Sequence, residues 1–178
     1  MLYHFLVPLA SEHQFFNLFR YITFRAGGAF LTALIFGFIF GRPLIDVLRK
    51  TQGKGQPIRD DGPESHFSKA GTPTMGGLLI VGALLTSTLL WARLDNPFVL
   101  LVLFVTLAYG LVGFWDDYAK VSKQNTAGVS GKARLAIGFV ITGIAAVWAT
   151  WFHPTELQGE LALPVFKDVL IHLGIFFV

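Results

Sequence analysis

Two adjacent carboxylates, Asp116 and Asp117, close a long uncharged run that begins at Pro97. As a helix, the run 97–115 rises about 28 Å, close to the roughly 30 Å hydrocarbon core of a bilayer, so the pair arrives at a membrane surface. The C-terminal end of a helix disfavours carboxylates, and Lys120 is spaced to offset part of that charge. The pair is therefore a candidate for chemistry, although charged residues also end transmembrane helices simply because they stop insertion.

The composition indicates an integral membrane protein. Of the 178 residues, 53% are hydrophobic and only 14% are charged, whereas an ordinary soluble domain has about 25% charged residues. Cysteine is absent, which excludes a disulfide framework, a thiolate metal site and a cysteine nucleophile. No basic region precedes the first apolar residues, so a cleaved signal peptide is not expected. A nucleic-acid partner is not expected either.

The apolar runs predict an all-α fold, a polytopic transmembrane helical bundle that forms a single integral membrane domain over 1–178. After an interfacial segment over residues 1–20, four complete spans are expected at about 21–41, 72–91, 97–115 and 135–152. Polar loops are expected at 42–71 and 116–134. The last apolar run, 169–178, is too short to cross a bilayer as a helix, and we interpret it as an incomplete fifth span.

The distribution of cations predicts the orientation. The loops after the second and fourth spans hold only Arg93 and Lys167, whereas the loops after the first and third spans hold ten of the fourteen Lys and Arg residues. The positive-inside rule then places the N-terminus in the periplasm and both basic loops in the cytoplasm. The ten are Arg42, Arg49, Lys50, Lys54, Arg59, Lys69, Lys120, Lys123, Lys132 and Arg134.

With that topology, the second and fourth spans begin on the same side as the acidic pair. Thr72 is a plausible N-cap for the second span with Pro73 at its first position, and Ser130 opens the fourth span in a similar way. Lys69 and Lys132 add a cation to each start. Positive helix N-termini beside two carboxylates predict a site for a phosphorylated substrate and a divalent metal.

Two motifs carry a resemblance to a known family. The stretch from Pro57 to Gly77 reads PIRDDGPESHFSKAGTPTMGG, and about forty residues later Gly113 to Lys120 reads GFWDDYAK. Together they resemble the phospho-N-acetylmuramoyl-pentapeptide-transferase family, in the polyprenyl-phosphate hexose-1-phosphate transferase superfamily. The resemblance covers the chain from its first span onward and corresponds to the N-terminal half of family members.

The resemblance implies an activity in peptidoglycan biosynthesis, and hence in cell wall formation, cell shape and division. The family transfers phospho-N-acetylmuramoyl-pentapeptide from its UDP donor to undecaprenyl phosphate, giving lipid I and UMP, with Mg²⁺ as cofactor. It acts at the cytoplasmic face of the bacterial inner membrane. By position, Asp117 matches the proposed general base or nucleophile and Asp116 matches its neighbour near the metal and the phosphates. Other positions match polar residues of the substrate cleft, namely Lys69, Thr74, Lys120 and Lys132.

The resemblance also sets limits. Family members are about twice as long, and their metal-binding aspartate, an Asn/Asp-rich loop and a histidine cluster lie in the second half, so the metal ligands are expected beyond Val178. The chain is therefore expected to be an N-terminal fragment that is inactive alone. Two alternatives stay open: a related UDP-N-acetylhexosamine-1-phosphate transferase, and a transporter or flippase subunit. A non-catalytic membrane scaffold, in which Asp116 and Asp117 tolerate Asn, and the formation of a homodimer also stay open.

Overall fold

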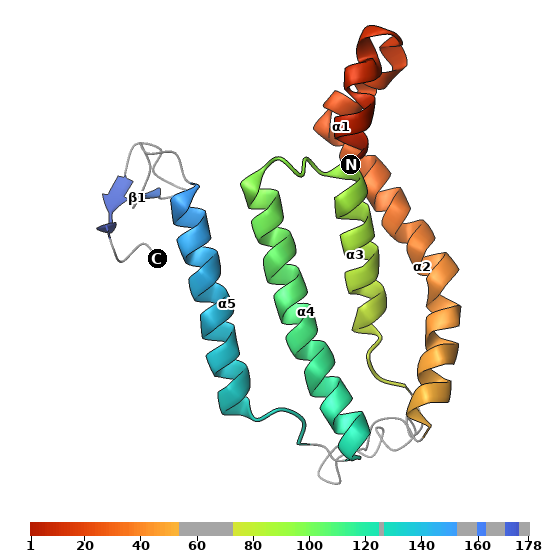
Figure 1. Ribbon diagram of the computed structural model, residues 1–178, viewed down its shortest axis with the longest axis vertical. Coiled ribbons are helices and arrows are strands. Elements are labelled where there is room, and N and C mark those ends of the chain that lie inside the picture. Colours follow the sequence, from red (N-terminus) through yellow and green to blue (C-terminus); the bar gives the residue numbers. More distant parts are fainter. Residues whose placement is uncertain (54–72, 125–126, 153–159, 163–169, 175–178) are drawn as a thin grey trace.

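The computed structural model describes residues 1–53, 73–124, 127–152, 160–162 and 170–174. Four long helices, α2 to α5, lie side by side in chain order, and each contacts the next (Figure 1). A short N-terminal segment packs at one end of this row, next to α2 and α3. The elements are α1 (Leu2–Leu6), η1 (Pro8–Ser11), η2 (Gln14–Arg20), α2 (Ile22–Gln52), α3 (Gly77–Trp91), α4 (Pro97–Lys123), α5 (Gly131–Trp151), β1 (Glu160–Ala162) and β2 (Leu170–His172).

Three of these helices, α2, α4 and α5, are long and apolar enough to cross a membrane. Helix α3 is apolar as well, but its 15 residues rise only about 22 Å. Large apolar side chains cover the outside of the row, and Phe38, for example, is 79% exposed. Lipid chains solvate such a surface as well as a protein core does. The helical membrane class expected from composition is thus confirmed in outline, whereas the number of spans stays a prediction.

The sequence predicts the acidic pair at the end of its helix, but in the structure the pair lies inside the helix. Helix α4 begins with Asn96 as an N-cap that accepts a hydrogen bond from the Phe98 N–H, and it continues past the pair to Lys123. Residues 116–123 are therefore helical rather than part of a loop. The extension is stable because Lys120, one turn further on, pairs with Asp116 across the helix surface.

The second helix begins later than the sequence indicated. Thr72 lies outside the described residues, and Pro73 is not helical; α3 begins at Gly77 with Gly76 as its N-cap. The backbone cannot be helical earlier because Met75 has a φ of 69°, in the left-handed region. For α5, in contrast, Ser130 is the N-cap and accepts a hydrogen bond from the Ala133 N–H, which confirms that part of the prediction.

The C-terminal part departs from an all-α fold. Leu170–His172, inside the expected fifth span, form β2 and pair antiparallel with β1, so that Leu161 lies opposite Ile171. The expectation of a transmembrane helix is wrong for these three residues. The backbone N–H and C=O groups of a strand need partners on a neighbouring strand. Strand pairing satisfies the same groups, and β-branched residues such as Ile171 favour it.

Trp91 holds α2 and α3 together at the end next to the N-terminal segment. Its ring lies directly over Gly28, where any side chain would collide with it. The indole N–H donates to the Thr32 hydroxyl at 2.9 Å, and the ring stacks on Phe19 at a centroid distance of 5.8 Å. A glycine lets the backbone of α2 approach an indole closely, as small residues do in membrane helix contacts.

We expect Gly28→Ala to lower the free energy of unfolding by about 1–3 kcal/mol, because the new methyl group overpacks the contact with Trp91. Gly27→Ala is the matched control, since a Cβ at Gly27 meets nothing within 4 Å and alanine favours the helix. Unfolding of the detergent-solubilised chain, followed by circular dichroism, measures both. Equal effects of the two substitutions would contradict this packing.

Candidate functional site

The candidate site lies where the end of α2, the start of α3, the second half of α4 and the start of α5 come together. Asp116 and Asp117 line a cavity of about 280 Å³ whose other walls come mostly from α3 and α4. Met75, just before α3, and Gly77, the first residue of α3, line one side of the cavity, and Gly110 lines it from α4. The expectation that the second and fourth spans begin beside the acidic pair is confirmed by this arrangement.

Asp116 is buried, with 6% of its surface exposed, and both of its oxygens are occupied. The Lys120 ammonium lies 2.7 Å from Oδ2, and the Arg134 guanidinium lies 3.6 Å from the same oxygen. Oδ1 accepts the Val129 N–H at 2.8 Å. Such a carboxylate is held by charge-assisted bonds in a place where solvent screens them weakly. It ties the segment before α5 to the side of α4.

Gly128 allows the chain before α5 to come close to the Asp116 side chain. Its φ is +60°, and a Cβ built on it lies 2.5 Å from Asp116 Oδ1 and 2.8 Å from Lys120 Cε. Only glycine combines that backbone conformation with so close an approach at little cost. The glycine therefore lets the Val129 N–H reach the buried carboxylate.

Asp117 has a different environment although it is the next residue. Its side chain is 31% exposed, and among the described residues the partner of Oδ1 is the Lys120 ammonium at 3.9 Å. Oδ2 accepts the Thr74 hydroxyl at 3.0 Å. One oxygen of Asp117 is therefore fixed by a neutral donor, and the other faces space in which a ligand can bind.

Thr74 reaches Asp117 because Gln52, at the end of α2, holds its backbone. The Thr74 N–H donates to Gln52 Oε1 at 2.8 Å, and Gln52 Nε2 donates to the Thr74 carbonyl at 3.1 Å. Gln52 is itself buried. This paired amide contact fixes both polar groups of the residue just before the positive φ of Met75, and so it aims the Thr74 side chain at α4.

The structure brings together four of the six residues expected at the site: Asp116, Asp117, Thr74 and Lys120. Lys69 lies outside the described residues. Lys132 is exposed at the start of α5 and has no hydrogen bond or ion pair among the described residues. Helix periodicity places residues 132 and 134 on different faces, which explains why the neighbouring cation is the one that reaches Asp116.

Sequence reasoning missed three contributors to the site. Arg134 was visible as one of the cations at the start of α5, but not as a partner of Asp116. Gln52 gave no signal, because a glutamine at the end of a long helix is ordinary. The Val129 N–H is a backbone group, and its role depends on the path of the chain between α4 and α5.

The two carboxylates differ in whether they can bind a metal ion. The described part of the chain has no group of three or more His, Asp or Glu side chains arranged to hold a metal ion. Asp116 does not fit as a ligand, because a lysine, an arginine and a backbone N–H occupy its oxygens. Asp117 Oδ1 fits as a single carboxylate ligand, and Mg²⁺ is often held by one or two carboxylates together with substrate phosphates.

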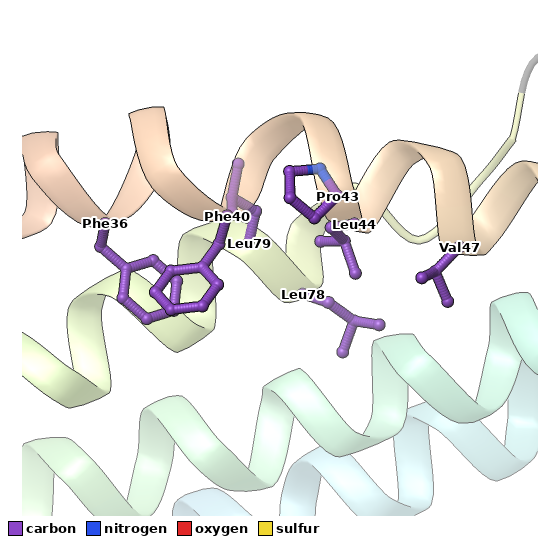
Figure 2. Close-up of a pocket in the computed structure, with 7 residues that line it drawn as sticks. All are labelled: Phe36, Phe40, Pro43, Leu44, Val47, Leu78 and Leu79. Carbon is purple, nitrogen blue, oxygen red and sulfur yellow. The ribbon is translucent and has the colours of Figure 1, made fainter.

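An apolar pocket adjoins the site (Figure 2). It has a volume of about 290 Å³ and lies between α2 and α3, and Leu78 lines both it and the cavity with the acidic pair. Pro43 contributes to it from within α2, where proline leaves a helix carbonyl without its usual donor. The lining residues are Phe36, Phe40, Pro43, Leu44, Val47, Leu78 and Leu79.

These observations define a helical membrane protein with a polar, doubly acidic site at one end of its helices, next to an apolar surface. Residues 69–81, which include Thr74 and the start of α3, match signature 1 of the phospho-N-acetylmuramoyl-pentapeptide-transferases. The resemblance indicated by the two motifs is thereby confirmed. The whole chain corresponds to the N-terminal half of members of this family.

Similar proteins agree with the signature. Two proteins named phospho-N-acetylmuramoyl-pentapeptide-transferase align with this chain over 178 residues. The protein from Ruegeria sp. (strain TM1040) is 75% identical to it, and the protein from Ruegeria pomeroyi is 76% identical. Another, from Dinoroseobacter shibae, is 65% identical over 179 residues. Each alignment covers 100% of this chain and 49% of the relative. The chain thus spans about half the length of the curated relatives it matches.

The different surroundings of the two carboxylates predict different effects on stability. We expect Asp116→Asn to lower the free energy of unfolding by about 3 kcal/mol, because it leaves the Lys120 ammonium, on a side chain that is only 19% exposed, without its nearest carboxylate partner. Asp117→Asn should cost less than about 1 kcal/mol, because its carboxylate is partly exposed and its bond from Thr74 survives in the amide.

Chemical unfolding of the detergent-solubilised variants measures this difference. Asp46→Asn, on an exposed position of α2, serves as the control for the loss of one acidic charge. A larger loss of stability for Asp117→Asn than for Asp116→Asn would contradict the assignment.

Proposed function

We propose that this chain supplies the acidic-pair half of a phospho-N-acetylmuramoyl-pentapeptide-transferase active site. The proposal is carried by the setting of Asp117: Thr74 fixes one of its oxygens, Lys120 is the partner of the other among the described residues, and Asp117 lines a cavity that adjoins an apolar pocket. This arrangement lies on the segment that carries the family signature. Relatives up to 76% identical carry the name of this transferase.

The proposed substrates are UDP-N-acetylmuramoyl-pentapeptide and undecaprenyl phosphate. An oxygen of the lipid phosphate attacks the phosphorus attached to the sugar, and the bond from that phosphorus to the bridging oxygen of UMP breaks. The products are lipid I and UMP. Like charges must approach in this step, so catalysis depends on positioning and on cations near the phosphates.

The described residues divide the work of the site. Asp117 Oδ1 faces the cavity and takes the role of general base toward the lipid phosphate or of nucleophile, as the family resemblance implies. Thr74 fixes the rotamer of Asp117 by its hydrogen bond. Lys120 contacts Asp116 and approaches Asp117, so its charge lies where an anionic substrate enters. Lys69 and Lys132 are proposed to contact the donor as it approaches.

Mg²⁺ is the proposed cofactor, and when bound it would offset charge on the donor diphosphate. Of the acidic pair, Asp117 is the better candidate to bind it, because in the described part of the chain its Oδ1 has one distant partner, Lys120 at 3.9 Å, whereas the oxygens of Asp116 are occupied. The apolar pocket beside the site offers a surface to the isoprenoid chain of the acceptor. We place the site on the cytoplasmic face of the bacterial inner membrane, with a periplasmic N-terminus, because the basic residues concentrate at this end.

The test is a chimera in which residues 1–178 replace the matching half of the Ruegeria pomeroyi relative. Reconstituted in proteoliposomes with undecaprenyl phosphate, it should release UMP from UDP-N-acetylmuramoyl-pentapeptide only when Mg²⁺ is present. Asp117→Asn should lower kcat by about 10²–10⁴, the range for loss of a general acid or base. Thr74→Val should lower kcat less, because it loosens Asp117 without removing it.

Asp95→Asn is the matched control, since Asp95 is a carboxylate between α3 and α4, at the other end of the helices, and its loss should leave kcat unchanged. The 178-residue chain alone, which is expected to be inactive, is measured in parallel. Preference for UDP-N-acetylglucosamine as donor would instead support the related transferase. Full UMP release by the Asp117→Asn chimera would contradict the proposal.

A further inference from the structure

A second polar cavity lies at the opposite end of the helices from the acidic pair. Its volume is about 450 Å³, and it lies between the start of α2, the end of α3 and the turn into α4. Several polar side chains and an indole line it together with small apolar residues: Arg25, Ser87, Thr88, Trp91, Arg93 and Asn96. The cavity has the size of a site for a small organic ligand.

Two of the lining groups are buried polar atoms without a partner. Ser87 is 5% exposed, and its hydroxyl makes no hydrogen bond in the described structure. Arg25 Nε is likewise buried without a partner. Buried polar groups are rarely left unpaired, because losing water without gaining another partner is costly. The guanidinium Nε can only donate and the serine hydroxyl can donate as well, so one acceptor ligand satisfies both groups.

The charge in the cavity points to an anion. The Arg25 guanidinium donates from Nη1 to the Trp91 carbonyl at 3.4 Å and lies 5.0 Å from the centre of the Tyr3 ring. Among the described residues, no carboxylate pairs with Arg25. Arg93 differs, because Asp95 accepts two hydrogen bonds from it, at 3.3 and 2.7 Å. Arg25 therefore brings to the cavity that Ser87 also lines a positive charge that no carboxylate of the described residues compensates.

The position of the cavity favours a lipid as the source of the anion. Arg25 lies in the first turn of an apolar helix long enough to span a membrane, and Trp91 ends α3. Tryptophan and arginine at helix ends lie at the level of lipid headgroups. A phosphate oxygen in this layer accepts from a guanidinium more strongly than a neutral group does.

We propose that this cavity binds the phosphate group of an anionic phospholipid. The guanidinium of Arg25 pairs with the phosphate through Nε, and the Ser87 hydroxyl donates to a phosphate or ester oxygen. The site does not depend on the acidic pair or on the transferase activity. It anchors the start of α2 and the end of α3 to one membrane surface.

The test uses the full 178-residue chain, purified in a detergent that contains no phosphate and titrated with phosphatidylglycerol under native mass spectrometry. Saturable binding of about one lipid per chain is expected. Arg25→Gln should raise the dissociation constant at least about tenfold, the effect of losing a charged hydrogen bond. Arg49→Gln, in the same helix but at its other end, is the matched control and should leave the constant within about twofold of the parent.

Ser87→Ala separates a binding role from a folding role. Without lipid, its melting temperature should equal or exceed that of the parent, because it removes a buried hydroxyl that has no partner. The rise in melting temperature on adding phosphatidylglycerol should be smaller than in the parent. Equal lipid affinity in the parent and Arg25→Gln would overturn the proposal. Tighter binding of inorganic phosphate than of phosphatidylglycerol would overturn the lipid assignment.

Discussion

The ion pair between Asp116 and Lys120 supports the rest of the candidate site. A carboxylate this buried is stable as an anion only if its oxygens are paired, and here Lys120, Arg134 and the Val129 N–H pair them. The first partner keeps α4 helical beyond the acidic pair. The other two bring the start of α5 against α4. One buried charge thus organises two helices at the end where the chemistry is proposed.

The second carboxylate depends on a separate set of contacts from the other side. Gln52 ends α2 and fixes the backbone of Thr74, and Thr74 then fixes one oxygen of Asp117. Adjacent residues on a helix point in directions about 100° apart. Asp116 therefore faces α5 while Asp117 faces the start of α3. This geometry explains how two adjacent aspartates acquire different partners: Asp116 is held by Lys120, Arg134 and the Val129 N–H, and Asp117 by Thr74.

The sequence predicted which residues belong to the site better than it predicted the contacts between them. Charge and hydropathy made Asp116, Asp117 and Lys120 candidates, and the resemblance of the surrounding motif to a known family selected them over charges that merely end a membrane helix. The Ser130 cap followed from residue type. Gln52 could not be predicted, because its role depends on a contact between the end of α2 and the backbone of Thr74, just before α3. The strand at Leu170–His172 was missed because leucine and isoleucine occur in both helices and strands, and its pairing with Glu160–Ala162 is a contact between separate segments.

Among the described residues, Asp117 is accessible to a ligand whereas the partners of Asp116 occupy its oxygens. Carboxyl labelling tests it most directly: the membrane-embedded chain is treated with a water-soluble carbodiimide and glycine ethyl ester, and fragment mass spectrometry resolves the two sites. The account predicts much faster labelling of Asp117 than of Asp116, with the exposed Asp46 as the reference for an accessible carboxylate. Labelling of Asp116 at the same rate as Asp117, or faster, would contradict it.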